Sequence, residues 1–409
     1  MKILLVNKFH NVKGGSETYY FGLGEMLKRA GHEVIYFSMK DEKNVPCEQE
    51  KYFVENVDFN APMGKLALVK ASLKMLYSFE AKKKFDKLLT DEKPDIIHLN
   101  IFQSQLTGSI VDAAKKHNIP IVYTAHDLKS VCPNYQMMNK GEICEKCITG
   151  NYTNCFKSGC MKNSKLKSLL ATMEAYVYKL KKTYNKIDLV ITPSAFYKKK
   201  INEAGVMKCS VVHMANFLPE GTEYSLSEPG DYILYFGRLS HEKGTMTLLK
   251  AYEKANVNNP LYYVGTGPVK DQLEEYVKVH NLSDKVKLLG FKSGEELKKL
   301  VRDSLCVVLP SEWYENGPYT IMEAMAVSKP VIVTSLGGLP EMVDNGENGY
   351  VVSPFNTEEL STALTAICKL DANQLKLMGE KSMQKAKNSF DSKKYIEELV
   401  LKYNELLSE

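Results

Sequence analysis

The sequence predicts an α/β protein made of two doubly wound, Rossmann-like domains, each built on a parallel sheet. Its 409 residues are enough for two domains that each bury a core. Short apolar runs typical of buried parallel strands alternate with helical segments along the chain. A stretch rich in proline and glycine, residues 216–230, interrupts this alternation and reads as a linker.

These observations divide the chain into four parts. The N-terminal Rossmann-like domain is expected at residues 1–215, with a cysteine-rich insertion at 130–162. The linker is followed by a second domain at residues 231–388 and by a C-terminal helical segment at 389–409.

The charge is unevenly distributed between the two halves. Residues 1–215 hold 33 Lys and Arg against 21 Asp and Glu, whereas the remainder holds 21 against 28. A basic N-terminal half favours an anionic membrane surface or a phosphate-bearing acceptor as partner, although a solvated surface gives the same count. No basic helix or aromatic sheet motif accompanies the charge, so we expect no nucleic-acid partner.

The location expected from the sequence is the cytoplasm, peripherally at the inner face of the membrane. No apolar run approaches 18 residues, and the apolar start of the chain is too short for a signal peptide. Two lysine-rich helices, 65–89 and 165–186, read as amphipathic and could dock on a membrane, with ordinary core packing as the alternative.

In the first half, two positions follow strands at the edge where open α/β sheets bind ligands. Gly14 and Gly15 lie in the loop between a strand at 3–6 and a helix at 17–30, where they let a ligand approach the backbone. His126 follows a strand at 120–123. The other elements expected here are strands at 34–37, 94–99, 187–191 and 210–212 and a helix at 104–117.

The insertion contains five of the nine cysteines. Clustered thiols in the cytoplasm more often hold a metal than form disulfides, and thiolates suit Zn²⁺. The candidate ligands of a structural Zn²⁺ are Cys144, Cys147, Cys155 and Cys160, with free or redox-active thiols as the alternative. The insertion could also cover the acceptor side of the site.

The second half begins with a strand at 232–236, a loop at 237–244 and a helix from residue 245. Arg238 and Lys243 lie in this loop near a helix start, where a diphosphate could sit. Arginine would grip it with two hydrogen bonds and lysine with a point charge. Glycine turns also follow the strands expected at 261–264 and 286–289.

Residues 305–343 form one β-α-β unit that carries two acids. A strand at 306–309 leads to a polar loop with Glu315, then a helix from Pro318 with Glu323, then a strand at 330–333. A helix start suits a phosphate, whereas carboxylates suit the hydroxyls of a ribose and a second polyol. The alternative is that Glu315 caps the helix and Glu323 faces water.

The combination of these motifs resembles family 4 retaining glycosyltransferases of the GT-B fold. The residues that carry the resemblance are Glu315 and Glu323, Asn316-Gly317-Pro318 between them, and Gly337-Gly338-Leu339-Pro340-Glu341. The resemblance extends from the N-terminus to about residue 350. It implies a nucleoside-diphosphate sugar held in a central cleft between two Rossmann-like domains. It also implies that the last helix, 392–408, crosses back onto the N-terminal domain.

The resemblance assigns roles to individual residues. Arg238 and Lys243 would bind the departing diphosphate, Glu315 the sugar hydroxyls, Glu323 the ribose, and His126 the sugar near its anomeric carbon. The expected catalytic residues are therefore His126, Arg238, Lys243 and Glu315, without a catalytic metal. The remaining donor-binding residues would be Gly14, Gly15, Gly290, Phe291, Asn316, Gly317, Pro318, Tyr319 and Glu323.

The predicted function is transfer of a sugar, with retention of its anomeric configuration, to a hydroxyl of a glycan or lipid-linked glycan acceptor. The alternatives are a nucleotide-sugar epimerase, a phosphorylase of the same fold, or a non-catalytic nucleotide-sugar-binding subunit. The sequence names neither the donor sugar, the base, the acceptor nor the oligomeric state.

Overall fold

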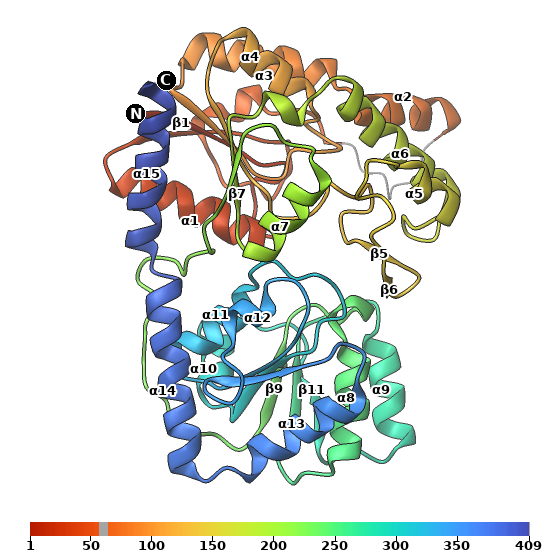
Figure 1. Cartoon of the computed structure of the whole chain (residues 1–409), viewed down its shortest axis with the longest axis vertical. Coiled ribbons are helices and arrows are strands. Elements are labelled where there is room, and N and C mark those ends of the chain that lie inside the picture. Colours follow the sequence, from red (N-terminus) through yellow and green to blue (C-terminus); the bar gives the residue numbers. More distant parts are fainter. Residues whose placement is uncertain (57–63, 409) are drawn as a thin grey trace. The chain divides into compact units, whose positions relative to one another are not determined.

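The computed structural model describes residues 1–56 and 64–408, without the side chains of residues 65–68. It divides into two compact units, one of residues 1–220 with 392–409 and one of residues 221–391. The division after Glu220 falls within the stretch 216–230. Each unit is an α/β domain with a six-stranded parallel sheet, which confirms the predicted fold class (Figure 1).

The sheet of the first unit has the strand order β2-β1-β3-β4-β7-β8. Its four central strands consist of short runs that are almost entirely buried, as parallel strands covered by helices require, whereas the two edge strands are partly exposed. They are β1 Lys2–Val6, β2 Glu33–Phe37, β3 Ile96–Leu99, β4 Ile121–Thr124, β7 Leu189–Thr192 and β8 Ser210–His213.

Helices surround this sheet, and a small hairpin lies in the cysteine-rich insertion. The helices are α1 Gly15–Arg29, α2 Lys65–Leu76, α3 Phe79–Glu92, α4 Ser109–Lys116, α5 Thr153–Ser158, α6 Lys165–Leu180, α7 Ala195–Ala204 and α15 Ser392–Ser408. The 3₁₀ turns are η1 Glu48–Tyr52 and η2 Tyr184–Lys186, and the hairpin pairs β5 Met138–Asn139 with β6 Glu142–Ile143.

The sheet of the second unit has the order β11-β10-β9-β12-β13-β14. Its strands are β9 Ile233–Phe236, β10 Leu261–Val264, β11 Val286–Leu288, β12 Cys306–Leu309, β13 Val331–Thr334 and β14 Gly349–Val352. Its helices are the 3₁₀ turn η3 His241–Lys243, α8 Thr245–Ala255, α9 Lys270–Val279, α10 Gly294–Arg302, α11 Tyr319–Ala326, α12 Leu339–Met342, α13 Thr357–Lys369 and α14 Ala372–Ser389.

Each strand order contains a switch point, where successive connections leave the sheet in opposite directions. In the second unit the switch lies between β9 and β12, and in the first between β1 and β3. Loops at the carboxyl ends of the two strands diverge there and leave a crevice, which is where open α/β sheets bind ligands. The loops after β9 and β12 carry Arg238, Lys243 and Glu315.

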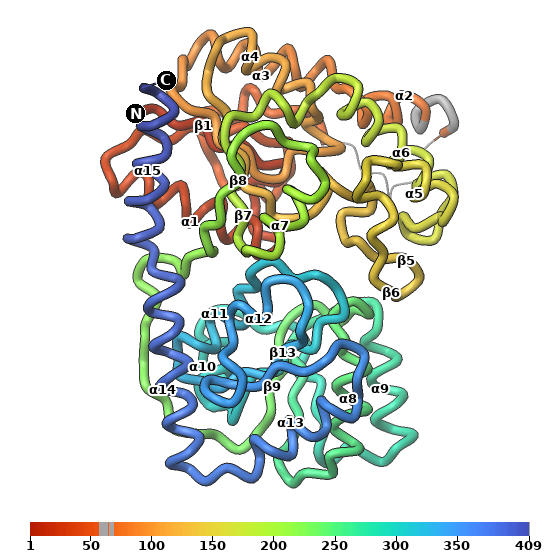
Figure 2. The backbone as a smooth tube through the Cα atoms, in the orientation of Figure 1, coloured from red at the N-terminus to blue at the C-terminus, as the bar shows by residue number. Residues whose placement is uncertain are grey.

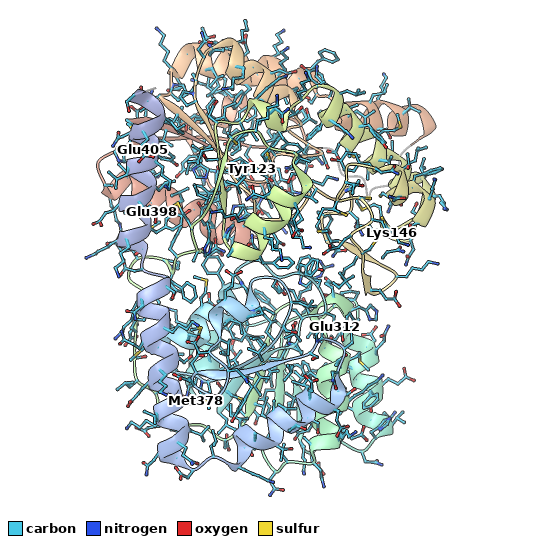
Figure 3. The ribbon with its side chains drawn as sticks, viewed as in Figure 1. Tyr123, Lys146, Glu312, Met378, Glu398 and Glu405 are labelled. Atoms are coloured by element: carbon cyan, nitrogen blue, oxygen red, sulfur yellow. The ribbon has the colours of Figure 1, made fainter. Side chains whose placement is uncertain are left out.

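The C-terminal helix α15 packs on the first unit, although the preceding helix α14 belongs to the second. Figure 2 shows α15 beside α1, and contacts between these helices agree with the view. Tyr395 and Tyr403 are buried, whereas Glu398 and Glu405 on the same helix are exposed (Figure 3). The tyrosines join a buried polar network described below.

Three predicted helices differ from the structure, and the one expected at 165–186 ends already at Leu180. The helix expected at 65–89 is broken into α2 and α3 at Tyr77 and Ser78, because the Ser78 hydroxyl accepts a hydrogen bond from Ala81 N–H and starts a new helix. The helix expected at 104–117 begins only at Ser109. Ser104 and Thr107 have left-handed backbone angles (φ 67° and 64°) that no helix tolerates.

Candidate functional site

The loops after β9, β12 and β13 pack backbone against backbone at the switch point of the second unit. Gly244, with a φ of 65°, lies so close to Pro310 that an added Cβ would stand 1.9 Å from its carbonyl oxygen. Gly337, with a φ of 64°, approaches Glu315 in the same way, at 2.1 Å from its carbonyl oxygen. These two glycines hold the Glu315 loop between its neighbours.

Three donors converge on the buried Glu315 carboxylate. Lys243 Nζ donates to Glu315 Oε1 at 2.5 Å, Ser311 Oγ at 2.5 Å and Trp313 Nε1 at 2.8 Å. The Glu315 side chain is 6% exposed, and the Lys243 ammonium also lies 5.2 Å from the centre of the Trp313 ring. A buried carboxylate needs such partners, so Lys243 and Glu315 form one charge-paired unit.

Arg238 differs from Lys243 because its side chain is exposed and, among the described residues, makes no ion pair. Its backbone is fixed, since Tyr235 donates from its hydroxyl to the Arg238 carbonyl at 2.7 Å. The guanidinium therefore projects from an anchored loop. Arginine is also rare in this chain, since only three of its 54 Lys and Arg residues are arginines. An arginine in a glycine-bounded loop therefore stands out in the sequence independently of motif spacing.

Glu323 is the fifth residue of α11, about one turn beyond the loop that carries Glu315. Its side chain remains accessible to solvent, yet surrounding protein replaces much of the water around the carboxyl. This desolvation raises the pKa of Glu323 to about 7, against a small opposing effect from Lys298. The carboxyl is thus poised to change its charge near neutral pH.

The remaining predicted donor residues border the same loops. Pro318 directly precedes α11, and Asn316 and Gly317 are the two residues before it. No side chain caps the start of this helix. Tyr319 is buried in the first turn. Gly290 accepts a hydrogen bond from Gly265 N–H at 2.8 Å beyond β11, and Phe291 next to it is 72% exposed.

In the first unit, Gly14 and Gly15 form the start of the 15-residue helix α1. Gly14 has an extended backbone, and no side chain caps this helix either. The nearby acid Glu17 is instead buried, where Asn7 Nδ2 and Ser16 Oγ donate to its Oε1 at 3.2 and 3.0 Å. The helix start therefore presents backbone N–H groups at the loop after β1.

His126 is held as a neutral imidazole of known tautomer. Asn100 Nδ2 donates to the Val6 carbonyl at 3.2 Å, so Asn100 Oδ1 faces His126 Nε2 at 2.8 Å. Because Oδ1 only accepts, Nε2 carries the proton and Nδ1 is the basic nitrogen. Burial lowers the pKa of His126 to about 3, which keeps the ring uncharged.

A polar network that includes the C-terminal helix positions the His126 ring. Tyr19 packs edge-on against it, with ring centres 4.8 Å apart, and shares hydrogen bonds with Thr124 at 3.1 Å and Tyr395 at 2.5 Å. His98 links the same Thr124 to Tyr403, at 2.7 and 2.5 Å. Helix α15 therefore supports the histidine site within the first unit.

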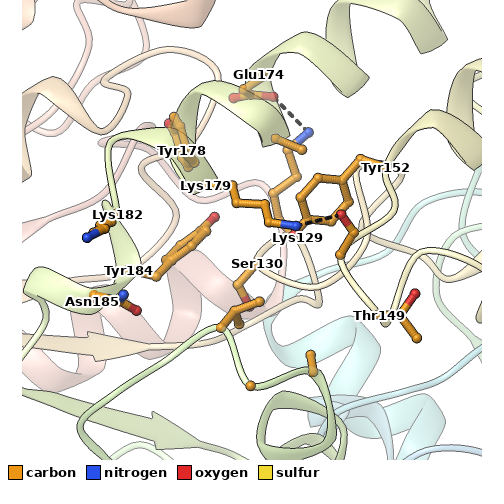
Figure 4. Close-up of a pocket in the computed structure, with 15 residues that line it drawn as sticks. Lys129, Ser130, Thr149, Tyr152, Glu174, Tyr178, Lys179, Lys182, Tyr184 and Asn185 are labelled. Carbon is orange, nitrogen blue, oxygen red and sulfur yellow. Dashed lines mark hydrogen bonds and ion pairs between the residues drawn. The ribbon is translucent and has the colours of Figure 1, made fainter.

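A cavity of about 300 Å³ lies beside the insertion in the first unit (Figure 4). Its wall contains Lys129, Lys179 and Lys182, with Lys129 paired to the buried Glu174 at 2.9 Å. Ser130 Oγ, also in the wall, is buried and has no hydrogen-bond partner among the residues that the structure describes. This basic, polar lining suits a phosphate or sugar group.

The cysteines of the insertion do not form the predicted metal site. Among the described residues, no three or more His, Cys, Asp or Glu side chains are placed so that they could hold a metal ion. The predicted ligands Cys144, Cys147, Cys155 and Cys160 are neighbours, since Cys147 lies close enough to Cys144 and Cys155 for their charges to interact, but they are not arranged to hold a metal. Cys155 and Cys160 instead lie against each other, at an Sγ–Sγ distance of 3.2 Å.

Sequence reasoning missed the residues that support the site. Ser311 and Trp313 hold Glu315, Asn100 fixes the His126 tautomer, and Tyr19 packs on its ring. Ser311 and Trp313 lie four and two residues before Glu315. A carboxylate in a loop with no Lys or Arg close to it in sequence needs other hydrogen-bond donors, and this could have pointed to them. Asn100 follows β3 at the switch point, a position that could have marked it.

Comparison with known proteins accounts for most of the chain. Residues 13–216 match the family described as Glycosyltransferase Family 4, and residues 222–385 the family described as Glycosyl transferases group 1. An uncharacterised glycosyltransferase of Methanocaldococcus jannaschii is 28% identical over 370 residues, which cover 88% of this chain and 87% of the relative. A 42.6 kDa protein from the cps region of Klebsiella pneumoniae is 26% identical over 357 residues, or 84% and 87%.

A solved structure shares the fold along its whole length. The crystal structure of Anabaena HepE in complex with UDP superposes with a TM-score of 0.70 at 18% identity and covers 99% of this chain and 100% of that one. The two family matches and the paired α/β domains agree with the motifs around Glu315 and Glu323. The chain belongs to family 4 of the glycosyltransferases, enzymes of the GT-B fold that use nucleotide sugars.

Proposed function

We propose that this enzyme transfers a sugar from a nucleoside diphosphate to a hydroxyl of a glycan or lipid-linked glycan acceptor, with retention of configuration. The observation that carries the proposal is the Lys243–Glu315 pair beside the exposed Arg238 at the switch point of the second unit. It combines cations for a diphosphate with a carboxylate for hydroxyl groups in loops of one sheet edge.

The chemical problem is the charge that develops when the sugar leaves the diphosphate. The sugar becomes oxocarbenium-like while negative charge accumulates on the phosphate. We assign Arg238, Lys243 and the start of α11 to the phosphate, because preorganised donors that meet developing charge are each worth about 3–4 kcal/mol. In the first unit, Gly14 and Gly15 at the start of α1 are our candidates for binding a phosphate through backbone N–H groups.

Glu315 is assigned to the sugar hydroxyls rather than to nucleophilic attack. Its Oε1 already accepts three hydrogen bonds, which spread its charge and weaken it as a nucleophile. We therefore assign no carboxylate nucleophile, and propose that the departing phosphate assists deprotonation of the acceptor on the same face. We assign the neutral His126 to the sugar near its anomeric carbon.

The acceptor class is inferred from the relatives and the charge of the first unit. The Klebsiella relative comes from a cps region, and a colanic acid biosynthesis glycosyltransferase of Salmonella typhimurium matches 53% of this chain at 25% identity. We propose a cell-envelope polysaccharide precursor as acceptor. The basic cavity lined by Lys129, Lys179 and Lys182 is our candidate for binding its phosphate.

Product analysis with and without acceptor tests the proposed reaction. UDP-glucose is the first donor to try, because HepE was crystallised with it. Transfer requires the acceptor, whereas an epimerase changes the donor without one and a phosphorylase needs phosphate. A binding subunit would leave the donor unchanged in every reaction. Product with the donor's anomeric configuration is expected, and an inverted product would contradict retention.

Replacing Glu323 with alanine is expected to weaken binding of the sugar donor and of the free nucleoside diphosphate by similar factors. The reason is that the ribose is common to both ligands, and Glu323 is assigned to its hydroxyls. Isothermal titration calorimetry with UDP-glucose and UDP measures the two affinities. If the variant bound only the sugar donor more weakly, and UDP as tightly as the wild type, Glu323 would be assigned to the sugar instead of the ribose.

The same assignment predicts a pH dependence of donor binding. The free Glu323 carboxyl has a pKa of about 7, and only its ionised form can accept two ribose hydroxyls. Affinity for UDP-glucose should therefore rise with pH through 7 and level off above it, with release of a proton on binding. UDP-glucose lacks the terminal phosphate ionisation near pH 6 that complicates UDP. The Glu323→Gln variant should lose this rise, and an equally steep rise in it would assign the titration elsewhere.

An apolar stripe on the first unit supports contact with a membrane. Helices α2 and α6 pack against each other, and α6 turns Ser168, Thr172 and Glu174 inward. The exposed residues, here called the α2–α6 surface, are Val69, Leu73, Leu166, Leu169 and Met173, at 37% to 61% exposure. None of the helices in the described ranges has the length and apolar composition needed to cross a bilayer. We propose that the α2–α6 surface lies on an anionic bilayer.

Sedimentation with vesicles measures this contact. We expect binding to anionic vesicles that weakens with salt, because each nearby basic residue contributes about 1 kcal/mol that salt screens. The Leu166→Asp/Leu169→Asp variant should lose most of the binding. A matched control changes Leu377 and Leu401, exposed leucines on other helices, to Asp. Equal, weak binding to anionic and neutral vesicles would contradict the proposed membrane contact, and the lysines would then be ordinary solvated surface residues.

A further inference from the structure

The end of helix α5 brings two cysteines together. Gly159 follows the helix with a φ of 66°, and its N–H donates to the Phe156 carbonyl at 3.1 Å. The Cys160 N–H donates to the Cys155 carbonyl at 3.4 Å. This pair of bonds is the Schellman motif, which folds the residue after the glycine back onto the last turn of the helix. The local sequence therefore dictates the cysteine pair.

The two sulfurs are in direct contact. Cys160 S–H donates to Cys155 Sγ across 3.2 Å. This hydrogen bond is the largest influence on the Cys155 thiol and lowers its pKa to about 7, while the pKa of Cys160 is raised. The remaining proton is shared between the two sulfurs after the first one leaves. The pair therefore loses its first proton more easily than an isolated thiol does.

The two members differ in access to solvent. Cys155 is 1% exposed and packs in a small apolar cluster with Cys147, Tyr152 and Ala171. Cys160 lies at the edge of this cluster and is half-buried. A reagent from solution therefore meets Cys160 first and finds Cys155 directly behind it.

We propose that Cys155 and Cys160 form a redox-active dithiol that closes to an intramolecular disulfide by exchange with a low-molecular-weight disulfide. The proposal rests on the Schellman geometry, the 3.2 Å contact and the one-sided access, and it is independent of the sugar-transfer mechanism.

The exchange proceeds in two balanced steps. When the shared proton moves from Cys160 to Cys155, the accessible Cys160 thiolate attacks the small disulfide, displaces one thiolate and forms a mixed disulfide. Cys155 then loses its proton and attacks Cys160 Sγ, which releases the second small thiolate. Two protein thiols are oxidised to one disulfide, and the small disulfide is reduced to two thiols.

The disulfide would close the last turn of α5 covalently where this helix packs on α6. Tyr152, just before α5, accepts a hydrogen bond from Thr172 Oγ1 of α6 at 3.2 Å, and Ser168 Oγ accepts one from Met161 N–H at 2.9 Å. Oxidation would therefore make the end of α5 more rigid, next to the two hydrogen bonds that hold this segment on α6.

Thiol trapping after incubation in glutathione redox buffers tests the proposal on the full-length protein. Alkylation and peptide mass mapping should show loss of two reactive thiols per chain and a disulfide that joins Cys155 to Cys160. The Cys155→Ser variant should accumulate a glutathione mixed disulfide on Cys160, whereas Cys160→Ser should give little adduct on the buried Cys155. Cys144→Ser, a half-buried cysteine of the same segment, is the matched control and should oxidise as the wild type does.

Three results would overturn the proposal. The first is that both thiols remain alkylated in fully oxidised glutathione in folded protein. The second is that oxidation pairs Cys144 with Cys147 instead. The third is that protein purified without added metal carries one equivalent of zinc, and that its removal by a chelator is needed before Cys155 and Cys160 react. Far-UV circular dichroism of each variant shows whether the fold is retained.

Discussion

Replacing Arg238 or Lys243 with alanine is expected to lower kcat by about 10²–10³-fold, because each is assigned to the charge that develops on the departing diphosphate. The two variants should differ in stability. Arg238 is exposed and makes no ion pair among the described residues, so its loss leaves nothing unpaired. Removal of Lys243 takes a cation from the buried Glu315, and this variant should unfold at a lower temperature.

Steady-state kinetics and thermal unfolding of the same preparations separate these effects. Arg302→Ala is the matched control, because Arg302 is a half-buried arginine of the second unit whose contact with Glu295 is long, at 3.9 Å. It should keep the wild-type kcat. Near wild-type turnover in Arg238→Ala or Lys243→Ala would refute the assignment of these cations to the diphosphate.

Most of the fold could be predicted because each strand is indicated by a short stretch of its own sequence. The buried runs at β1, β4 and β12 are apolar for three or four residues and lie between turn residues, so pattern alone finds them. The loop from Gly237 to Gly244 was also predictable, since its glycines mark both ends. In these cases the information lies within about ten residues of sequence.

What the sequence did not reveal depends on distant or competing contacts. Lys243 meets Glu315 across 72 positions, and no local pattern announces that pair. The break after α2 depends on Ser78, whose capping bond outweighs a continuous helical pattern. In the insertion, the C-x-x-C spacing pointed to a metal, but the turn at Gly159 pairs Cys155 with Cys160. Local turn geometry prevailed over motif spacing.

Replacing Glu315 with alanine is expected to lower kcat by about 10²–10³-fold while the dissociation constant for UDP changes much less. The reason is that UDP has no transferred sugar, so it cannot use a carboxylate assigned to sugar hydroxyls. Removal of this acceptor also leaves the Ser311 and Trp313 donors without their partner, at a cost of about 1–3 kcal/mol each in folding free energy if they stay buried.

The Glu315→Gln variant separates the charge from the hydrogen bonds. Glutamine keeps an oxygen that can accept from Ser311 and Trp313 but no longer neutralises Lys243, so it should restore most of the stability and little of the turnover. Glu312→Gln is the matched control, because Glu312 lies in the same loop but its carboxylate accepts a hydrogen bond from Thr247 Oγ1, at 2.5 Å, and not from Lys243. Kinetics and UDP titration of the three variants decide the assignment. If Glu315→Ala weakened UDP binding as much as turnover, while Glu323→Ala affected turnover alone, the roles assigned to the two acids would be exchanged.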